Sequence, residues 1–211
     1  MDAIRHLLDT PQLLALAAAL GWASGIRLYA AVFLAGIAGW MGWLTLPPGL
    51  QVLQHPAMLG ASGFMLFIEF FADKIPGVDS LWDLVHTVIR IPAGAALAAG
   101  ALGADSNTMA TVAALLGGTL AATSHATKMT TRAAINTSPE PFSNIGMSLV
   151  EDGLVVGGLW LATTHPLLFG IVLAIGTVLM VWLLVVLVKF LKALLRRLAK
   201  LFGGNASPET T

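Results

Sequence analysis

The sequence contains no cysteine and few charged side chains. Of its 211 residues, 10% are charged and 57% are hydrophobic, and 11 basic and 11 acidic side chains give a net charge of zero. The absence of cysteine excludes disulfides and thiolate metal sites. Because a soluble domain carries roughly 25% charged residues, this deficit indicates a polytopic membrane protein. A net charge of zero gives no reason to expect nucleic acid as a partner.

The sequence also lacks the common catalytic motifs. It has no G-x-S-x-G, no H-E-x-x-H, no P-loop and no dinucleotide-binding fingerprint. We therefore predict no catalytic residues, no cofactor and no metal site, and an enzyme is the less favoured class.

Six apolar segments follow one another along the chain, which predicts an all-α bundle of about six transmembrane helices. They cover about residues 12–43, 57–72, 80–103, 108–130, 142–163 and 166–188. The first is too long for one straight span, and Gly21, Ser24 and Gly25 inside it indicate a kink or a break. A likeness between the first and fourth segments suggests a weak inverted repeat of three plus three spans. In this interpretation residues 1–188 form one membrane domain and 189–211 form a tail.

Lysine and arginine are distributed unevenly over the loops. With six spans, the two termini lie on the same side as the loops that hold Lys74, Lys128 and Arg132. The other three loops contain neither lysine nor arginine. The positive-inside rule therefore predicts that both termini are cytoplasmic. Arg132 is interpreted as a flanking residue whose side chain snorkels to the headgroups.

The C-terminal tail is strongly basic. Between Lys189 and Phe202, four basic residues share one helical face and apolar residues cover the others. This pattern predicts an amphipathic helix that binds anionic lipids of the cytoplasmic leaflet.

Polar residues recur at helical spacing within the stretch from 69 to 92, between apolar segments. Asp79, Asp83, His86 and Arg90 lie there, four, three and four residues apart. This spacing places them on one face of a helix. Ionisable groups in a membrane are costly and usually face a bundle interior or a water-filled cavity. We therefore expect this stretch to form the polar centre of the bundle.

The other candidate binding residues lie in the first, second, fourth and fifth segments. These are Arg27, Glu69, Asp73, Ser124, Lys128, Glu151 and Asp152. The cations, together with Arg90, suit a basic pocket for a phosphate, a carboxylate or a lipid headgroup. The carboxylates would instead neutralise the cations, or bind a proton or cation, and the sequence leaves both alternatives open. Because adjacent helical residues point about 100° apart, Glu151 and Asp152 are not expected to share one partner.

Three sequence blocks resemble a known family. They are GIRLYAAVFLAG, FFADKIPGVDSLWD with the later VIRIPAGA, and ATSHATKMTTRAAINTSPEPFSN. Over about residues 20–165 they are similar to a bacterial membrane-protein family known as domain of unknown function 4126. The resemblance implies a multi-pass protein of the bacterial inner membrane. Because that family has no settled activity, no catalytic residues can be carried over from it. It also implies that several residues form a family pattern: Asp73, Lys74, Pro76, Asp79, Asp83 and Arg90.

Two hypotheses for function follow from these patterns. The first is a small transporter or channel with a charged intramembrane site for a small ion, an anionic solute or a lipid headgroup. The alternative is a non-catalytic scaffold or partner subunit whose buried charges form a structural network. A homodimer suits either hypothesis, because a chain of 211 residues encloses little volume.

Overall fold

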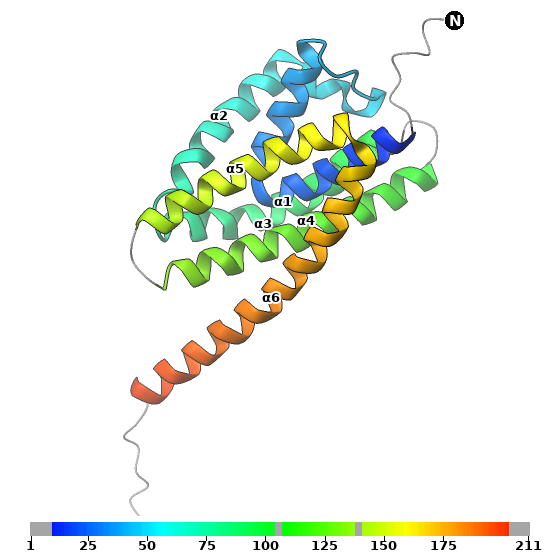
Figure 1. The fold of residues 1–211 in the computed structure, drawn as a ribbon. Helices are drawn as coiled ribbons and strands as arrows, with labels where there is room; N and C mark the ends of the chain where they lie inside the picture. Colours follow the sequence, from blue (N-terminus) through cyan, green and yellow to red (C-terminus); the bar gives the residue numbers. More distant parts are fainter. Residues whose placement is uncertain (1–9, 104–106, 138–140, 203–211) are drawn as a thin grey trace, which may run out of the picture.

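The computed structural model describes residues 10–103, 107–137 and 141–202, and within these ranges the chain forms helices and no strand (Figure 1). The elements are α1 (Thr10–Trp40), the 3-10 helix η2 (Pro48–Gln54), α2 (Pro56–Ala72), α3 (Val78–Leu102), α4 (Asn107–Ile135), α5 (Pro141–Thr164) and α6 (Pro166–Phe202). The predicted all-α class is confirmed.

Four helices, α1, α3, α5 and α6, are long and apolar enough to cross a membrane. The pair formed by η2 and α2 is bent by 69° and adds a fifth candidate if it counts as one span. Helix α4 is equally long but rich in threonine and does not qualify. The chain is therefore a polytopic membrane protein, and its described residues contain four to five candidate spans, where the sequence predicts about six.

Helix α1 is broken at Arg27, whose φ of −145° and ψ of 84° are not helical. Its two arms return to the same end of the bundle, because Leu16 of the first arm and Ala35 of the second lie with Leu159 of α5 around one small cavity. Arg27 itself contacts Ser148, about three turns away along α5. Thus α1 enters the bundle, turns at Arg27 and folds back (Figure 1). The residues that predict a break from the sequence, Gly21, Ser24 and Gly25, lie two to six positions before Arg27.

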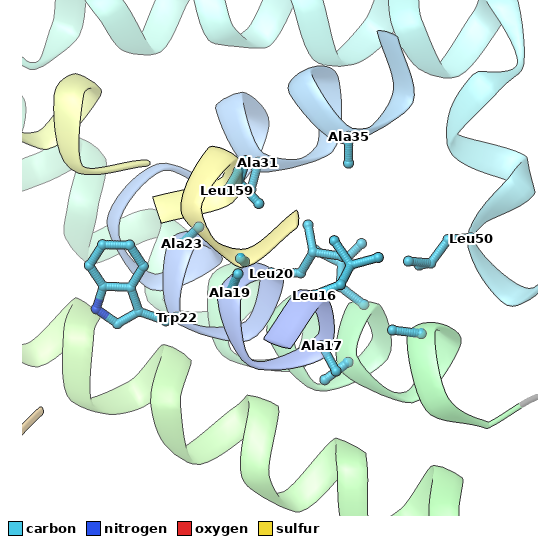
Figure 2. Packing of buried hydrophobic residues seen from close by; sticks show 14 of the residues in the cluster. Leu16, Ala17, Ala19, Leu20, Trp22, Ala23, Ala31, Ala35, Leu50 and Leu159 are labelled. Carbon is cyan, nitrogen blue, oxygen red and sulfur yellow. The ribbon is translucent and has the colours of Figure 1, made fainter. Parts of the chain in front are cut away.

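The hydrophobic core surrounds α1. In its most apolar window 78% of the residues are buried, whereas none is buried in the corresponding window of α6. Leu16, Leu20 and Trp22 of the first arm lie near Leu159 of α5 in the close view of this core (Figure 2). The other helices therefore pack around α1, and α6 lies at the periphery.

The fold-back of α1 changes how the chain ends are arranged. Both ends of α1 lie at the end of the bundle where α5 passes into α6, and α6 runs away from that end (Figure 1). The first and last described residues therefore lie at opposite ends of the bundle. The cytoplasmic side of both termini stays a prediction. Helix α4 has no matching break, so the predicted repeat is not visible in the shapes of these two helices.

Helix α6 is continuous across the predicted boundary between residues 188 and 189. The basic segment therefore extends the last helix as a rod beyond the bundle (Figure 1). Its binding to anionic lipids stays a prediction.

Glycine allows α1 to touch α4 closely. A Cβ on Gly25 would lie 2.0 Å from Oγ of Ser124 and 2.2 Å from the carbonyl oxygen of Ala121. We expect Gly25→Ala to lower the free energy of unfolding by about 1–3 kcal/mol, as overpacking does. Thermal melting in one detergent measures this effect. The control is Gly60→Ala in α2, where a Cβ meets nothing within 4 Å, and an equal loss in both variants would contradict the explanation.

Candidate functional site

A cluster of buried charges lies beside the break in α1, where five helices meet. We call the following ten residues the charge cluster: Arg27, Glu69, Asp73, Asp79, Asp83, Arg90, Lys128, Arg132, Glu151 and Asp152. All except Asp152 are buried. Because a charge in an apolar environment is costly unless it is paired, the partners of each member indicate what the cluster can do.

The Arg27 side chain connects α1 with α2 and α5. Its Nη1 lies 3.1 Å from Oδ2 of Asp73, and its Nε lies 2.8 Å from Oδ1 of Asp152. Its Nη2 donates a hydrogen bond of 2.7 Å to Oγ of Ser148 and lies 3.8 Å from Oε2 of Glu151. The expectation that Glu151 and Asp152 share no partner is therefore wrong. The planar guanidinium presents several nitrogens, so one arginine reaches both acids.

Arg90 lies inside α3 and binds two carboxylates. It donates to Oε1 of Glu69 at 2.5 Å and to Oδ1 of Asp83 at 2.6 Å. Its Nη1 lies 3.3 Å from Nδ1 of His125, which is also 3.3 Å from the carbonyl oxygen of Gly25. Nε2 of His125 lies 2.8 Å from Oγ1 of Thr87, so this histidine of α4 contacts both α3 and α1.

Lys128 occupies the middle of the cluster. Its ammonium lies 2.9 Å from Oδ2 of Asp73, 3.3 Å from Oδ1 of Asp83 and 3.3 Å from Oε2 of Glu151. It also donates to the carbonyl oxygen of Ile26 at 3.1 Å, next to the helix break. One ammonium therefore joins carboxylates from α3, α5 and the end of α2.

Arg132 is fully buried and does not snorkel, contrary to the prediction from sequence. It binds both carboxylate oxygens of Glu151, at 3.1 and 2.9 Å, and donates to the carbonyl oxygen of Asp73 at 2.8 Å. It also contacts Oδ1 of Asn144 at 3.1 Å and lies 3.8 Å from Oδ2 of Asp79. A positive residue near a helix end has the same appearance in sequence whether it snorkels or turns inward.

The sequence therefore predicts most of the cluster, but not that Arg132 belongs to it. Eight predicted site residues meet there: Arg27, Glu69, Asp73, Asp83, Arg90, Lys128, Glu151 and Asp152. Arg132 and Asp79 join them, and the spacing of Asp79 within its stripe already indicated its position.

Two predicted site residues lie outside the cluster. His86 stacks on Trp82, and its ring nitrogens lie 3.1 Å from the hydroxyl of Tyr29 and 2.8 Å from the carbonyl oxygen of Trp82. Ser124 donates to the carbonyl oxygen of Trp22 at 2.8 Å and thereby joins α4 to α1. The contact between His86 and Tyr29 likewise joins α3 to α1, so both predicted site residues hold helices together.

Lys74 lies at the edge of the cluster, in the connection between α2 and α3. Its ammonium donates to Oγ of Ser148 at 3.2 Å and lies 3.0 Å from the centre of the Phe70 ring. Partial burial lowers the pKa of this ammonium, and the positive charge of Arg27 acts in the same direction.

Three carboxylates of the cluster each keep one buried oxygen without a hydrogen-bond partner. These oxygens are Oε2 of Glu69, Oδ1 of Asp73 and Oδ2 of Asp83. Leaving such an acceptor unsatisfied in an apolar surrounding is costly. In the described part of the chain, no group of three or more histidine or acidic side chains is arranged to hold a metal ion.

A cavity of about 430 Å³ adjoins the cluster and is bounded by α1, α4, α5 and α6. Lys128 and Glu151 lie in its wall, and most of the remaining lining is apolar. The cluster is therefore accessible from a space large enough for a ligand.

The helical bundle and its charges define a polytopic membrane protein with a buried charge network. The chain belongs to the family described as Domain of unknown function (DUF4126), whose model matches residues 14–186. In comparisons with curated proteins and with solved structures, nothing matched the chain.

Proposed function

We propose that the protein is a small membrane transporter that takes up and releases a proton at the charge cluster. The observation that carries this proposal is the set of unsatisfied carboxylate oxygens on Glu69, Asp73 and Asp83. A proton on such an oxygen removes the negative charge of the carboxylate, and like charges at one site favour that protonation.

The charge balance of the cluster supports the same proposal. It contains six carboxylates and four cations, and Lys74 at its edge adds a fifth. Glu69 has Arg90 as its ion-pair partner, and Arg90 is shared with Asp83, which also meets Lys128. Of the three carboxylates with an unsatisfied oxygen, Glu69 has the fewest cation partners, because Asp73 also meets more than one cation, and we assign the exchanging proton to Glu69.

Infrared spectroscopy tests the assignment to Glu69. We expect the purified protein to show a protonated-carboxyl band that grows as the pH falls and is reduced in Glu69→Gln. Asp152→Asn is the control, because its side chain is 27% exposed and pairs with Arg27. A band that is unchanged in Glu69→Gln would contradict the assignment.

Proton movement tests transport itself. In proteoliposomes with a trapped pH dye and an imposed pH gradient, we expect faster equilibration than in protein-free vesicles. Glu69→Gln should abolish the difference, and Asp152→Asn should retain it. Equilibration at the rate of protein-free vesicles would overturn the proposal.

A scaffold with a structural charge network is the second candidate function. It is favoured by the extensive pairing, since each cluster cation contacts at least two acidic residues. Both functions predict that the cluster stabilises the fold, and only the first predicts proton flux.

A further inference from the structure

Helix α6 extends beyond the bundle as a basic segment. Residues 166–188 contain no charged side chain, and at ~1.5 Å per residue this stretch is roughly 34 Å long. It is therefore long enough to cross the hydrocarbon core of a bilayer, about 30 Å. We call residues 189–200, which continue the same helix, the basic extension (Figure 1). Because the apolar stretch ends at Lys189, the basic extension begins at a membrane boundary.

The basic extension carries a positive charge that the described part of the chain does not neutralise. Its five cations are Lys189, Lys192, Arg196, Arg197 and Lys200. All five are exposed, and none of them forms an ion pair within the described residues. The sequence contains no acidic residue from position 153 to position 208, so α6 itself supplies no counter-charge. These side chains are therefore available to an anionic partner.

Helical geometry sets the direction in which the five cations point. Met180 and Leu183 of α6 line the cavity, so this side of α6 faces the bundle. At ~100° per residue, the cations fall within an arc of about 140° that is centred roughly opposite that side. Phe190, Leu194 and Leu198 continue the bundle-facing side instead. The cations therefore point away from the bundle axis, toward the lipid that surrounds it.

The position of the cations along the helix axis brings them close to lipid headgroups. Lys192 lies ~5 Å beyond Lys189, and Lys200 lies roughly 17 Å beyond it. Long basic side chains bend back toward the membrane, and the attraction between charges acts over a screening length of about 8 Å. Basic clusters directly beside a transmembrane helix are typical of binding to anionic lipids. An acidic protein would have to compete with these headgroups for the same side chains.

We propose that the basic extension binds anionic phospholipids of the leaflet at which α6 leaves the membrane. In a lipid such as phosphatidylglycerol no cationic group balances the phosphate, which can pair with lysine and arginine side chains. The occupant is a membrane surface rather than a soluble phosphate, because only a surface offers linked sites to several cations at once. This binding holds the end of α6 at the headgroup layer and does not depend on proton transport.

Native mass spectrometry of the detergent-purified protein tests the lipid preference. We expect phosphatidylglycerol to bind at least about tenfold more tightly than phosphatidylcholine with the same acyl chains. A neutral variant should lose this preference; its substitutions are Lys192→Gln, Arg196→Gln, Arg197→Gln and Lys200→Gln. The matched control keeps every charge and should retain the preference; its substitutions are Lys192→Arg, Arg196→Lys, Arg197→Lys and Lys200→Arg. Because these side chains are exposed and all the replacements favour helix, both variants are expected to fold.

A nitroxide label tests the same binding in a bilayer. The chain contains no cysteine, so Ala193→Cys gives a single labelling site, which lies within the arc of the cations. In nanodiscs we expect the label to become less accessible to a water-soluble relaxation agent when phosphatidylglycerol replaces part of the phosphatidylcholine. High salt should reverse this change because it screens the charges, and the neutral variant should not show it.

Equal binding of the two lipids, or the same preference in the neutral variant, would overturn the proposal. Displacement of phosphatidylglycerol by an equal concentration of glycerol phosphate, its soluble head group, would also overturn it, since binding would then need no membrane surface. Binding of polyglutamate through the basic extension, without any lipid preference, would replace the membrane by an acidic protein as the partner. These measurements do not use proton flux, so this proposal and the proposed transport can fail separately.

Discussion

Replacing Asp73 with asparagine should lower the free energy of unfolding by about 3–5 kcal/mol, the typical cost of breaking a buried ion pair. Asp73 lies 3.1 Å from Arg27, 2.9 Å from Lys128 and 4.0 Å from Arg132. Its loss leaves three cations close together with less negative charge between them. Chemical or thermal unfolding in a fixed detergent measures the effect.

The control for this experiment is Asp152→Asn. Asp152 also binds Arg27, at 2.8 Å, but its side chain is 27% exposed. Water screens an exposed pair, which typically contributes about 0–1 kcal/mol. If the two substitutions lower the free energy of unfolding equally, burial does not determine how much each ion pair stabilises the fold.

Arg90→Leu should be similarly destabilising, by about 3–5 kcal/mol. It leaves Glu69 and Asp83 buried without the cation that holds them at 2.5 and 2.6 Å. The triple variant Arg90→Leu, Glu69→Gln, Asp83→Asn removes both acids as well. Because neutral side chains need no counter-charge, it should regain most of the lost stability.

Proton flux in the unsubstituted protein and in the triple variant separates the two candidate functions. A transporter that uses Glu69 should carry protons in the unsubstituted protein and be inactive in the triple variant although the fold is restored. A scaffold should show no proton flux in either protein. A triple variant that is as unstable as Arg90→Leu would show that Glu69 and Asp83 are not the reason for the loss.

The sequence predicts the polar centre well because spacing determines which side chains share a helical face. Asp79, Asp83 and Arg90 are spaced as one stripe, and all three are buried in α3. Arg27 and Lys128 are identified because an ionisable residue in an apolar run needs a partner. These inferences depend on local periodicity and on the cost of burying charge.

The sequence could not predict which partner each charge takes, nor the path of α1. The inward direction of Arg132 depends on Glu151, a residue 19 positions away on another helix. The fold-back at Arg27 depends on contacts with Asp73 and Ser148. The cavity depends on the separation of helices, which has no counterpart in the pattern of any one segment.

The break in α1 has a consequence for how the protein is made. Arg27 leaves the ribosome early, but its partners in α2 and α5 lie between 46 and 125 residues further along the chain. The carbonyl oxygen of Ile26 at the break likewise receives its hydrogen bond from Lys128 of α4. The helical hairpin at the centre of the bundle therefore cannot acquire its full set of contacts until α5 has been synthesised. Helix α1 is therefore synthesised first but is the helix whose contacts are completed last.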